Sequence, residues 1–488
     1  LDRTVKNMVM ALKCLRHIAF KMAVILLCYK QVSSESIFEP GVTDFSKVVK
    51  FKGFVDKSAL IEVIFRFRLV HITTPPLFGK TTNLDMFRRF VEADIDENGH
   101  RKDVNSSYNY KLFRENNLAI VKDHEVFEKY VGKFPVLYID FGVFKEPGSF
   151  GNVFEKFLHI VRDLYVKNKY LLKNATLFEK IPEDRDLFTA YLEGTATMKT
   201  VENITDALFF LTKYMKQHFT KSVFVLIDDF DAHVKSLMFK SNPDTDRIVT
   251  FIYRVMDKFV FDNEEYVYGA LATGELRTNL YDTLNESLTH WRHYGFATDH
   301  DYTKYYGLTG AEVDRLLGKV IPEEQQRIKA KSEIDDYYKG YTVVNQGFEV
   351  YNTYSVLSYL QRVKVQQPKP YWCHNECYET LKKLFVLNKF TGLVERLVSN
   401  KTVHLKVDKP IYKKHIIALS EVISNPHGKQ DSKLLQLGIN LLYHFGFLSM
   451  HPNCTVNFNN EIDAHVPNRE VLTVLQKALN EVKTKTNK

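Results

Sequence analysis

The chain has 488 residues, of which 45% are hydrophobic and 26% are charged, so it can bury large cores in roughly two or three domains and is not an intrinsically disordered polypeptide. Its formal net charge is +8, but the lysines and arginines are spread along the sequence without dense runs. This dispersal does not indicate a nucleic-acid partner, and no apolar stretch is long enough to predict a transmembrane segment.

The N-terminal segment has the order of features that is typical of a secretory signal peptide. Lys13, Arg16 and Lys21 precede an apolar run at residues 22–28, and small residues at 32–34 suit cleavage before Glu35. We therefore expect residues 1–34 to be a leader and the protein to be secreted. The alternative is a buried or interfacial helix in a cytoplasmic protein.

Cysteines and glycosylation sequons bear on whether the protein is secreted. Cleavage would leave Cys373, Cys377 and Cys454, and two of them can form a disulfide in a secreted protein; ordinary core thiols are the alternative. The segment from Cys373 to Cys377 resembles half a metal site, but no second pair at ligand spacing follows, so we expect no zinc. If the chain is secreted, six Asn-X-Ser/Thr sequons predict a glycoprotein, at Asn105, Asn174, Asn203, Asn285, Asn400 and Asn453.

The elements predicted up to about residue 300 alternate between strand and helix. After a lead-in at 37–64, an apolar run at 69–73 and a tight loop precede a helix whose apolar positions recur every three or four residues. A polar stretch at 94–117 is expected to lie on the surface. Because the later apolar runs do not alternate with polar residues, they predict parallel strands covered on both faces in an α/β fold. These runs lie at 136–141, 223–227 and 266–271, with helical periods at 149–172 and 201–218 between them.

The loop after the first strand ends in Gly79-Lys80-Thr81. At the start of a helix, this triplet offers close backbone approach, a cation for β/γ-phosphates and a hydroxyl for Mg²⁺. Thr74 stands where a P-loop has its first glycine, and a bare Gly-Lys-Thr is common by chance, so the triplet alone does not decide for a phosphate site.

Carboxylates follow the apolar run at 223–227. Asp228 would lie at the carboxyl edge of the sheet, where α/β folds bind ligands, and it can hold Mg²⁺ through water opposite Thr81. Asp229 can then polarise an attacking water. The alternative is a polar strand end that caps the next helix. Together with Gly79-Lys80-Thr81, the carboxylates favour the phosphate site.

Several short motifs occur in an order that resembles the AAA-ATPase-like family, whose bacterial members often carry a restriction-endonuclease-like domain at the C-terminus. The resemblance runs from about residue 43 to 471 and is carried by Val55-Asp56-Lys57-Ser58, Phe78-Gly79-Lys80-Thr81, Leu226-Ile227-Asp228-Asp229-Phe230-Asp231, Thr273-Gly274-Glu275-Leu276-Arg277, Tyr306-Gly307-Leu308-Thr309, Tyr338-Lys339-Gly340-Tyr341, Tyr351-Asn352-Thr353-Tyr354-Ser355-Val356, Pro370-Tyr371-Trp372 and Pro467-Asn468-Arg469-Glu470-Val471.

The resemblance implies a P-loop core that binds ATP and Mg²⁺. The loop residues Thr74, Phe78, Gly79, Lys80 and Thr81 would bind the nucleotide, with Thr81 and Asp228 at the metal. Asp229 would activate water, and Thr273 would sense the γ-phosphate. Arg277 would face a phosphate, although an arginine at such a position is more often structural.

Three departures from the family pattern bear on catalysis. The family loop usually reads Arg-Pro-Arg-Arg-Phe-Gly-Lys, whereas this chain has Thr74, Pro76 and Leu77 in place of the arginines. Asp229 replaces the usual glutamate and withdraws the carboxylate by one methylene. The sequence after Pro467 is also too short for a nuclease domain, and its Glu481 and Lys483 lie in a helical pattern.

We therefore expect a leader at 1–34, a P-loop core at 35–300, a helical lid-like region at 301–375 and a helical C-terminal domain at 376–488. The leading functional hypothesis is an ATP-binding protein with weak or lost hydrolysis and without nuclease activity. The second is a secreted, non-catalytic protein that uses the fold as a scaffold for an unidentified protein partner.

Overall fold

The computed structural model describes residues 36–279, 291–296, 299–343, 348–363, 367–373, 375–406, 410–428, 430–431, 433–452 and 461–486. The expected leader at 1–34, the sequons at Asn285 and Asn453, and Cys454 lie outside the described residues. Within them, no helix combines the length and the apolar character needed to cross a membrane.

A five-stranded sheet forms the centre of the molecule. Its strand order is β2-β3-β4-β1-β6, and every neighbouring pair is parallel. The predicted α/β fold with a parallel sheet is thus confirmed, and β6 adds a strand that no apolar run had indicated. The strands are β1 Leu69–Thr73, β2 Val136–Asp140, β3 Val223–Asp228, β4 Val267–Gly274 and β6 Arg292–Gly295.

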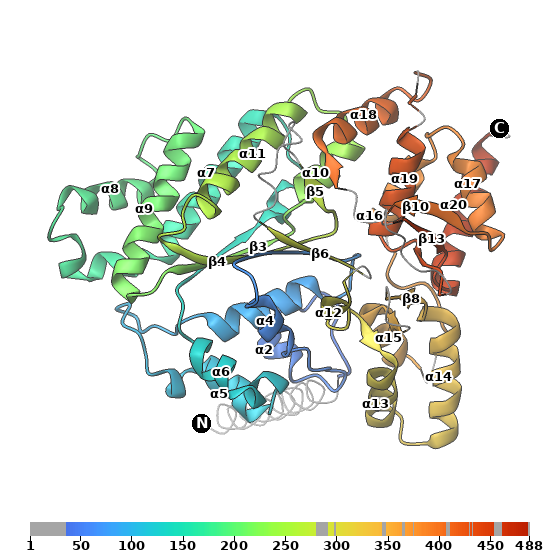
Figure 1. The fold of residues 1–488 in the computed structure, drawn as a ribbon, viewed down its shortest axis with the longest axis horizontal. Helices are drawn as coiled ribbons and strands as arrows, with labels where there is room; N and C mark the ends of the chain where they lie inside the picture. Colours follow the sequence, from blue (N-terminus) through green and yellow to red (C-terminus); the bar gives the residue numbers. More distant parts are fainter. Residues whose placement is uncertain are drawn as a thin grey trace, which may run out of the picture.

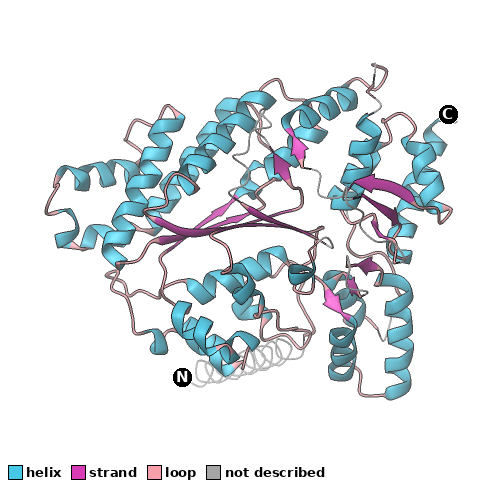
Figure 2. Ribbon diagram, viewed as in Figure 1, coloured by secondary structure: helices cyan, strands magenta, loops and turns pink. Residues whose placement is uncertain are grey.

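Both faces of the sheet are covered by helices, as Figure 2 shows. Successive residues of a strand belong to opposite cores: Val225 and Ile227 pack on one face, whereas Phe224 and Leu226 pack on the other. Because each face buries its side chains, β3 needs apolar residues at consecutive positions, and its six residues are all buried.

The two helical layers differ in size (Figure 1). One layer contains α2 Phe45–Val48, α3 Leu60–Ile64, α4 Lys80–Val91, α5 Tyr108–Glu115 and α6 His124–Tyr130, and the opposite layer contains α7 Phe150–Lys167, α8 Glu183–Glu193, α9 Val201–Phe219, α10 Ala232–Phe239 and α11 Thr245–Val260. Short 3₁₀ helices connect them at η1 Val104–Ser106, η2 Ala119–Lys122, η3 Phe141–Phe144, η4 Lys169–Lys173 and η5 Ala175–Phe178. The stretch expected to be a surface excursion includes α5, whose Leu112 and Phe113 are buried, so that expectation was wrong for this helix.

The lid-like region has its own small core around Leu308, Val313, Ile334 and Tyr338. Its helices are accompanied by an antiparallel sheet of order β7-β9-β8, whose strands are too short to show a period in the sequence. The elements are α12 His300–Thr303, β7 Leu308–Thr309, α13 Gly310–Val320, α14 Glu324–Tyr338, β8 Tyr341–Thr342, β9 Glu349–Tyr351 and α15 Thr353–Leu360.

The C-terminal region is mostly helical, as predicted, and includes a second antiparallel sheet of order β10-β13-β12. Its elements are α16 Asn375–Leu384, α17 Phe390–Val398, β10 Val403–Lys406, β11 Ile411–Tyr412, α18 Lys413–Ser424, α19 Lys433–His444, β12 Ser449–Met450, β13 Glu461–His465 and α20 Arg469–Thr486.

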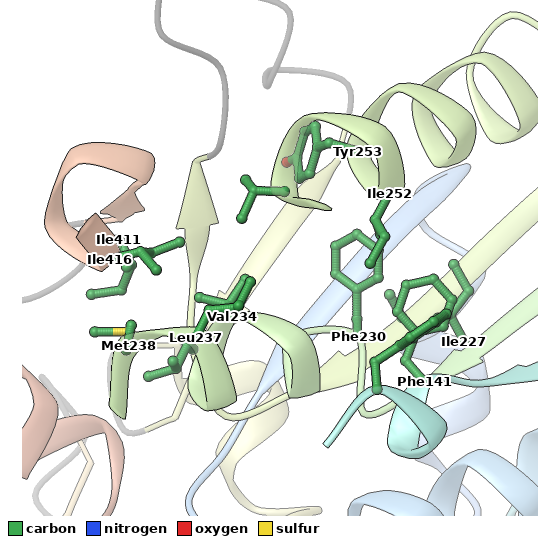
Figure 3. Packing of buried hydrophobic residues seen from close by; sticks show 14 of the residues in the cluster. Phe141, Ile227, Phe230, Val234, Leu237, Met238, Ile252, Tyr253, Ile411 and Ile416 are labelled. Carbon is green, nitrogen blue, oxygen red and sulfur yellow. The ribbon is translucent and has the colours of Figure 1, made fainter. Parts of the chain in front are cut away.

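This region packs directly on the core. Ile411 and Ile416 lie beside Leu237 and Met238 of α10, as Figure 3 shows, and all belong to one buried hydrophobic cluster. Strand β11 also pairs in parallel with β5 Thr278–Asn279, which follows β4. The C-terminal region therefore completes the hydrophobic core on one side of the sheet.

Candidate functional site

The loop between β1 and α4 turns at two residues with left-handed backbone. Leu77 has a φ of 64° and Gly79 a φ of 92°. Glycine adopts this conformation freely because it has no Cβ, whereas it strains leucine. Gly79 is the N-cap of α4, and no side chain caps the helix there. The first-turn N–H groups, at the positive end of the helix dipole, are therefore not covered by a capping side chain.

Lys80 is held by the loop itself. Its Nζ donates to the carbonyl oxygens of Thr74 at 2.9 Å and Pro75 at 3.0 Å, and its side chain is only 8% exposed. The Thr74 N–H in turn donates to the Gly274 carbonyl at 3.0 Å. Two of the three N–H groups of Lys80 are thus used by carbonyls, so a phosphate can accept from the third or displace one of these acceptors.

Asp228 ends β3 and is surrounded by hydroxyl groups. The Thr273 hydroxyl, from the neighbouring β4, donates to Oδ1 at 2.7 Å, and the Tyr138 hydroxyl donates to Oδ2 at 3.3 Å. Burial raises the pKa of Asp228, and the charge of Asp229 adds to the rise, while hydrogen bonds from Thr273 and Thr81 oppose it. The structure thus brings Thr81, Asp228 and Thr273 together.

Asp229 lies next to them with a φ of 51°. Its Oδ2 accepts a salt bridge from Lys145 Nζ at 2.8 Å. Burial alone would raise the pKa of Asp229, but the salt bridge to Lys145 and the charges of Lys80 and Lys235 lower it overall. Asp229 is therefore a weak base in this arrangement.

Glu275 lies between two lysines. Its Oε1 is 4.0 Å from Lys80 Nζ and its Oε2 is 3.1 Å from Lys235 Nζ, with the side chain 12% exposed. Asp231 accepts hydrogen bonds from the N–H groups of Glu275 and Leu276 and thereby fixes the turn after β4. Burial and the negative charge of Glu275 raise the pKa of Asp231.

A cavity of about 360 Å³ opens beside these groups. It is lined by the loop, by residues between 38 and 57 and by the lid-like region. Its charged lining consists of Glu39, Lys57, Lys80, Asp229 and Glu275, and Thr81 also lines it. The apolar lining includes Val42, Phe45, Val48, Phe54, Val55, Phe78, Met86 and Leu357. A cavity with both a charged and an apolar lining suits a ligand that has a charged and an apolar part.

Two other loop residues serve mainly to anchor the loop. The Phe78 ring lines the cavity but is 1% exposed, and its centroid is 4.6 Å from that of Phe296 and 5.1 Å from that of Tyr341. Pro75 touches the C-terminal region, since a Cβ at Gly446 would lie 3.0 Å from the Pro75 Cβ. The Tyr341 hydroxyl donates to the Gly446 carbonyl at 3.2 Å.

Of the predicted site residues, Thr74, Asp228, Thr273 and Arg277 do not line this cavity. Thr74 contributes through its backbone, as described above. Arg277 lies near a group of buried histidines, because its charge adds to burial in lowering the pKa values of His71, His293 and His444. Its carbonyl accepts from the Ile411 N–H at 2.8 Å.

A buried ion pair connects the cavity to the lid-like region. Lys57 Nζ donates to both carboxylate oxygens of Glu312, at 2.7 and 2.8 Å, and to the Lys304 carbonyl at 2.7 Å. Both side chains of the pair are 11% exposed. Glu312 also accepts from the Thr309 N–H at 2.8 Å and so caps α13.

Sequence reasoning assigned no role to Lys145, Tyr138 or the Lys57–Glu312 pair. Lys57 stands in one quoted motif and Glu312 lies three residues after another, but nothing in one sequence says that these two segments meet. Lys145 lies in the turn after η3, where the sequence carries no periodic signal. Only the folded chain reveals these contacts.

The C-terminal sheet carries two carboxylates, Glu461 and Asp463 on β13, which lie within 3.6 and 3.2 Å of His404 on β10. Throughout the part of the chain that the structure describes, no group of three or more His, Cys, Asp or Glu side chains is arranged to hold a metal ion. Cys373 and Cys377 are free thiols with their sulfurs 3.0 Å apart.

Comparison with known proteins identifies one family. A family model, AAA-ATPase-like, described as a predicted AAA-ATPase, matches residues 39–283, which is half of the chain. No curated protein matches the sequence. The matched range includes the loop at Lys80, the carboxylates after β3 and the end of β4.

Proposed function

Since the chain belongs to the AAA-ATPase-like family, we propose that its cavity binds a nucleotide, with ATP as the expected ligand and Mg²⁺ as the ion, and that hydrolysis is weak or lost. The observation that carries the proposal is the meeting of Lys80, Thr81 and Asp228 at the carboxyl edge of the sheet. The hydrogen bond between Thr81 and Asp228 joins the start of α4 to the end of β3. A cation, a hydroxyl and a carboxylate at a helix start are the groups that a Mg²⁺–nucleotide complex requires.

The residues present fit Mg²⁺. It prefers oxygen ligands and keeps several waters, so the Thr81 hydroxyl would bind it directly and Asp228 would bind it through water. The ion would offset the negative charge of the β- and γ-phosphates. Thr273 supports this arrangement because its hydroxyl orients Asp228.

Weak hydrolysis is supported by the surroundings of the carboxylate expected to polarise water. Asp229 is shorter than the usual glutamate and is held by Lys145. A salt-bridged carboxylate with a lowered pKa accepts a proton poorly. The positions of Thr74, Pro76 and Leu77 also lack the cations that the resemblance leads one to expect near the phosphates.

A titration of the protein beginning at Glu35 with a fluorescent ATP analogue, with and without Mg²⁺, tests the proposal. Wild type should bind, and Lys80→Ala should lose binding because the phosphates lose their cation. Lys240→Ala is the matched control, since Lys240 is a surface lysine with its side chain 67% exposed. Equal binding by wild type and Lys80→Ala would contradict a phosphate site at this loop.

The second candidate is a secreted scaffold for a protein partner. It is favoured by the loop carbonyls that already satisfy Lys80, which let the fold persist without a phosphate. On this proposal wild type shows no Lys80-dependent binding. Mass spectrometry of the N-terminus after expression in a eukaryotic secretory host tests secretion, with a start near Glu35 expected and an intact N-terminus on cytosolic material as the contrary result.

A further inference from the structure

Glu275 places a carboxylate inside the candidate phosphate site. It lines the same cavity as Lys80, and its Oε1 lies 4.0 Å from the Lys80 ammonium. Its backbone is fixed, because the Glu275 N–H donates to both oxygens of the buried Asp231, at 3.1 and 3.2 Å. The carboxylate therefore lies next to the cation that would bind the phosphates.

Charged groups of both signs lie near Lys80. Asp229 and Glu275 are its negative neighbours, and Lys145 and Lys235 accompany these two carboxylates. Both lysines are already engaged: Lys145 pairs with Asp229 at 2.8 Å, and Lys235 pairs with Glu275 at 3.1 Å. Among the residues that the structure describes, Lys80 is thus the cation of this group that has no carboxylate within 3.5 Å.

We infer that this pocket is selective for nucleoside diphosphates over triphosphates and that Glu275 is the specificity-determining residue. The inference rests on the proposed function, because it assumes that phosphates bind at Lys80. A P-loop lysine contacts the β- and γ-phosphates. A γ-phosphate therefore brings its negative charge close to Glu275, whereas a diphosphate ends one group earlier.

Lys235 offsets this repulsion only in part. It pairs with Oε2 of Glu275 at 3.1 Å, whereas Oε1 is the oxygen that lies 4.0 Å from Lys80. The Glu275 side chain is 12% exposed, so water screens its charge weakly. The penalty on a triphosphate should be larger than that on a diphosphate, and salt should reduce it only in part.

Isothermal titration of the full chain with ADP and with ATP, each with Mg²⁺, tests the inference. The variants are Glu275→Gln, which keeps the side-chain shape and removes the charge, and Glu376→Gln as matched control. Glu376 also approaches Lys235, at 3.6 Å, but its side chain is 69% exposed and it does not line the cavity. Lys80→Ala reports whether either nucleotide binds at the loop.

Wild type should bind ADP on the order of tenfold more tightly than ATP, as expected for charges a few ångströms apart in a partly buried site. Glu275→Gln should tighten ATP about tenfold and ADP about threefold at most, and Glu376→Gln should change neither. Wild type that binds ATP at least as tightly as ADP, or Glu275→Gln that strengthens both equally, would overturn the inference while leaving Lys80-dependent binding intact. If neither nucleotide binds to wild type or to Glu275→Gln in a Lys80-dependent manner, the proposed function is overturned, and this inference with it.

A second measurement needs no variant. Raising the salt concentration should lower the ADP-to-ATP affinity ratio of wild type, because screening weakens repulsion of the more highly charged ligand. Two results together would also count against the inference. They are an affinity ratio that stays constant as the salt concentration rises, and a melting temperature of Glu275→Gln well below that of wild type.

Discussion

At the scale of single residues, three charged groups of the cavity are already paired with partners in the protein. Lys80 donates to loop carbonyls, Asp229 pairs with Lys145, and Glu275 pairs with Lys235. Pairing of this kind stabilises the protein without a ligand. It also means that a nucleotide must exchange existing contacts for new ones, so only the difference between the two sets contributes to affinity.

The loop conformation depends on Gly79. A Cβ there would meet nothing within 4 Å, so the cost of Gly79→Ala comes from the backbone φ of 92° alone. We expect a loss of about 1–2 kcal/mol in the free energy of unfolding and weaker nucleotide binding. Gly318→Ala in the interior of α13 is the control. A Cβ at Gly318 also meets nothing within 4 Å, but the backbone φ there is ordinary, so this variant should raise the free energy of unfolding by about 0.5–1 kcal/mol. Urea unfolding of both variants decides; equal effects would exclude a backbone cause.

Asp229 should limit the rate more than the affinity. Asp229→Glu restores the missing methylene, and we expect it to raise residual Lys80-dependent ATPase activity on the order of tenfold without tightening nucleotide binding much. Leu77→Arg in addition should raise the rate further, because a cation near the loop offsets charge that develops on the γ-phosphoryl. A steady-state ATPase assay beside a binding titration checks this, with Lys80→Ala as the blank. If neither Asp229→Glu nor the double variant with Leu77→Arg shows an ATPase rate above that of Lys80→Ala, the site lacks more than these two groups.

At the scale of secondary-structure elements, the sequence predicted the sheet better than its surroundings. Runs such as 223–227 are apolar at every position because both faces are buried, and this leaves a strong signal. β6 was missed because Arg292 and His293 interrupt any apolar run. The motifs at Lys80 and Asp228 could be found from the sequence, because each follows a clear strand signal and the strand ends of a parallel sheet meet at one edge. The contact of Lys145 with Asp229 and the contact of Lys57 with Glu312 could not be predicted. In each case the separation of the two residues along the chain says nothing about their distance in space.

The Lys57–Glu312 pair should be costly to break from one side. Lys57→Met leaves a carboxylate with an 11% exposed side chain and without its cation, so we expect a loss of about 3–5 kcal/mol in the free energy of unfolding. Adding Glu312→Gln removes that charge and keeps an acceptor for the Thr309 N–H, so most of the stability should return. Chemical denaturation of the single and double variants measures the difference. A double variant as unstable as Lys57→Met would mean that packing of the lysine, and not charge, is what matters.

At the scale of the whole molecule, one buried carboxylate joins the lid-like and C-terminal regions. Glu470, at the start of α20, is 0% exposed, and its Oε1 accepts from the N–H groups of Tyr371 and Trp372 and from the Ser355 hydroxyl. Burial raises the pKa of Glu470 to about 8, although these hydrogen bonds oppose the rise. The segments it connects are far apart in the sequence.

Stability should therefore depend on pH through Glu470. The folded-state pKa of about 8 exceeds the ordinary value of 4.5, so the folded protein holds an extra proton between these values. This contribution is fully present below about pH 4.5 and is lost as the pH rises through about 8, by at most about 1.4 kcal/mol per pH unit. Glu470→Gln should remove this part of the slope. Urea unfolding of wild type and variant from pH 5.5 to 9 measures this slope. The contributions of the buried histidines are shared by both proteins and cancel in the difference. Parallel curves of unfolding free energy against pH would contradict the assignment to Glu470.

The contact between Pro75 and Gly446 has a mechanical consequence. The loop that would close around a phosphate begins at a residue that rests against the turn after α19, where a methyl group on residue 446 would fit only if its neighbour moved by a few tenths of an ångström. A displacement of Pro75 toward this turn would press on residue 446, which leads into β12. The loop therefore shares a direct contact with the half of the molecule outside the matched family range.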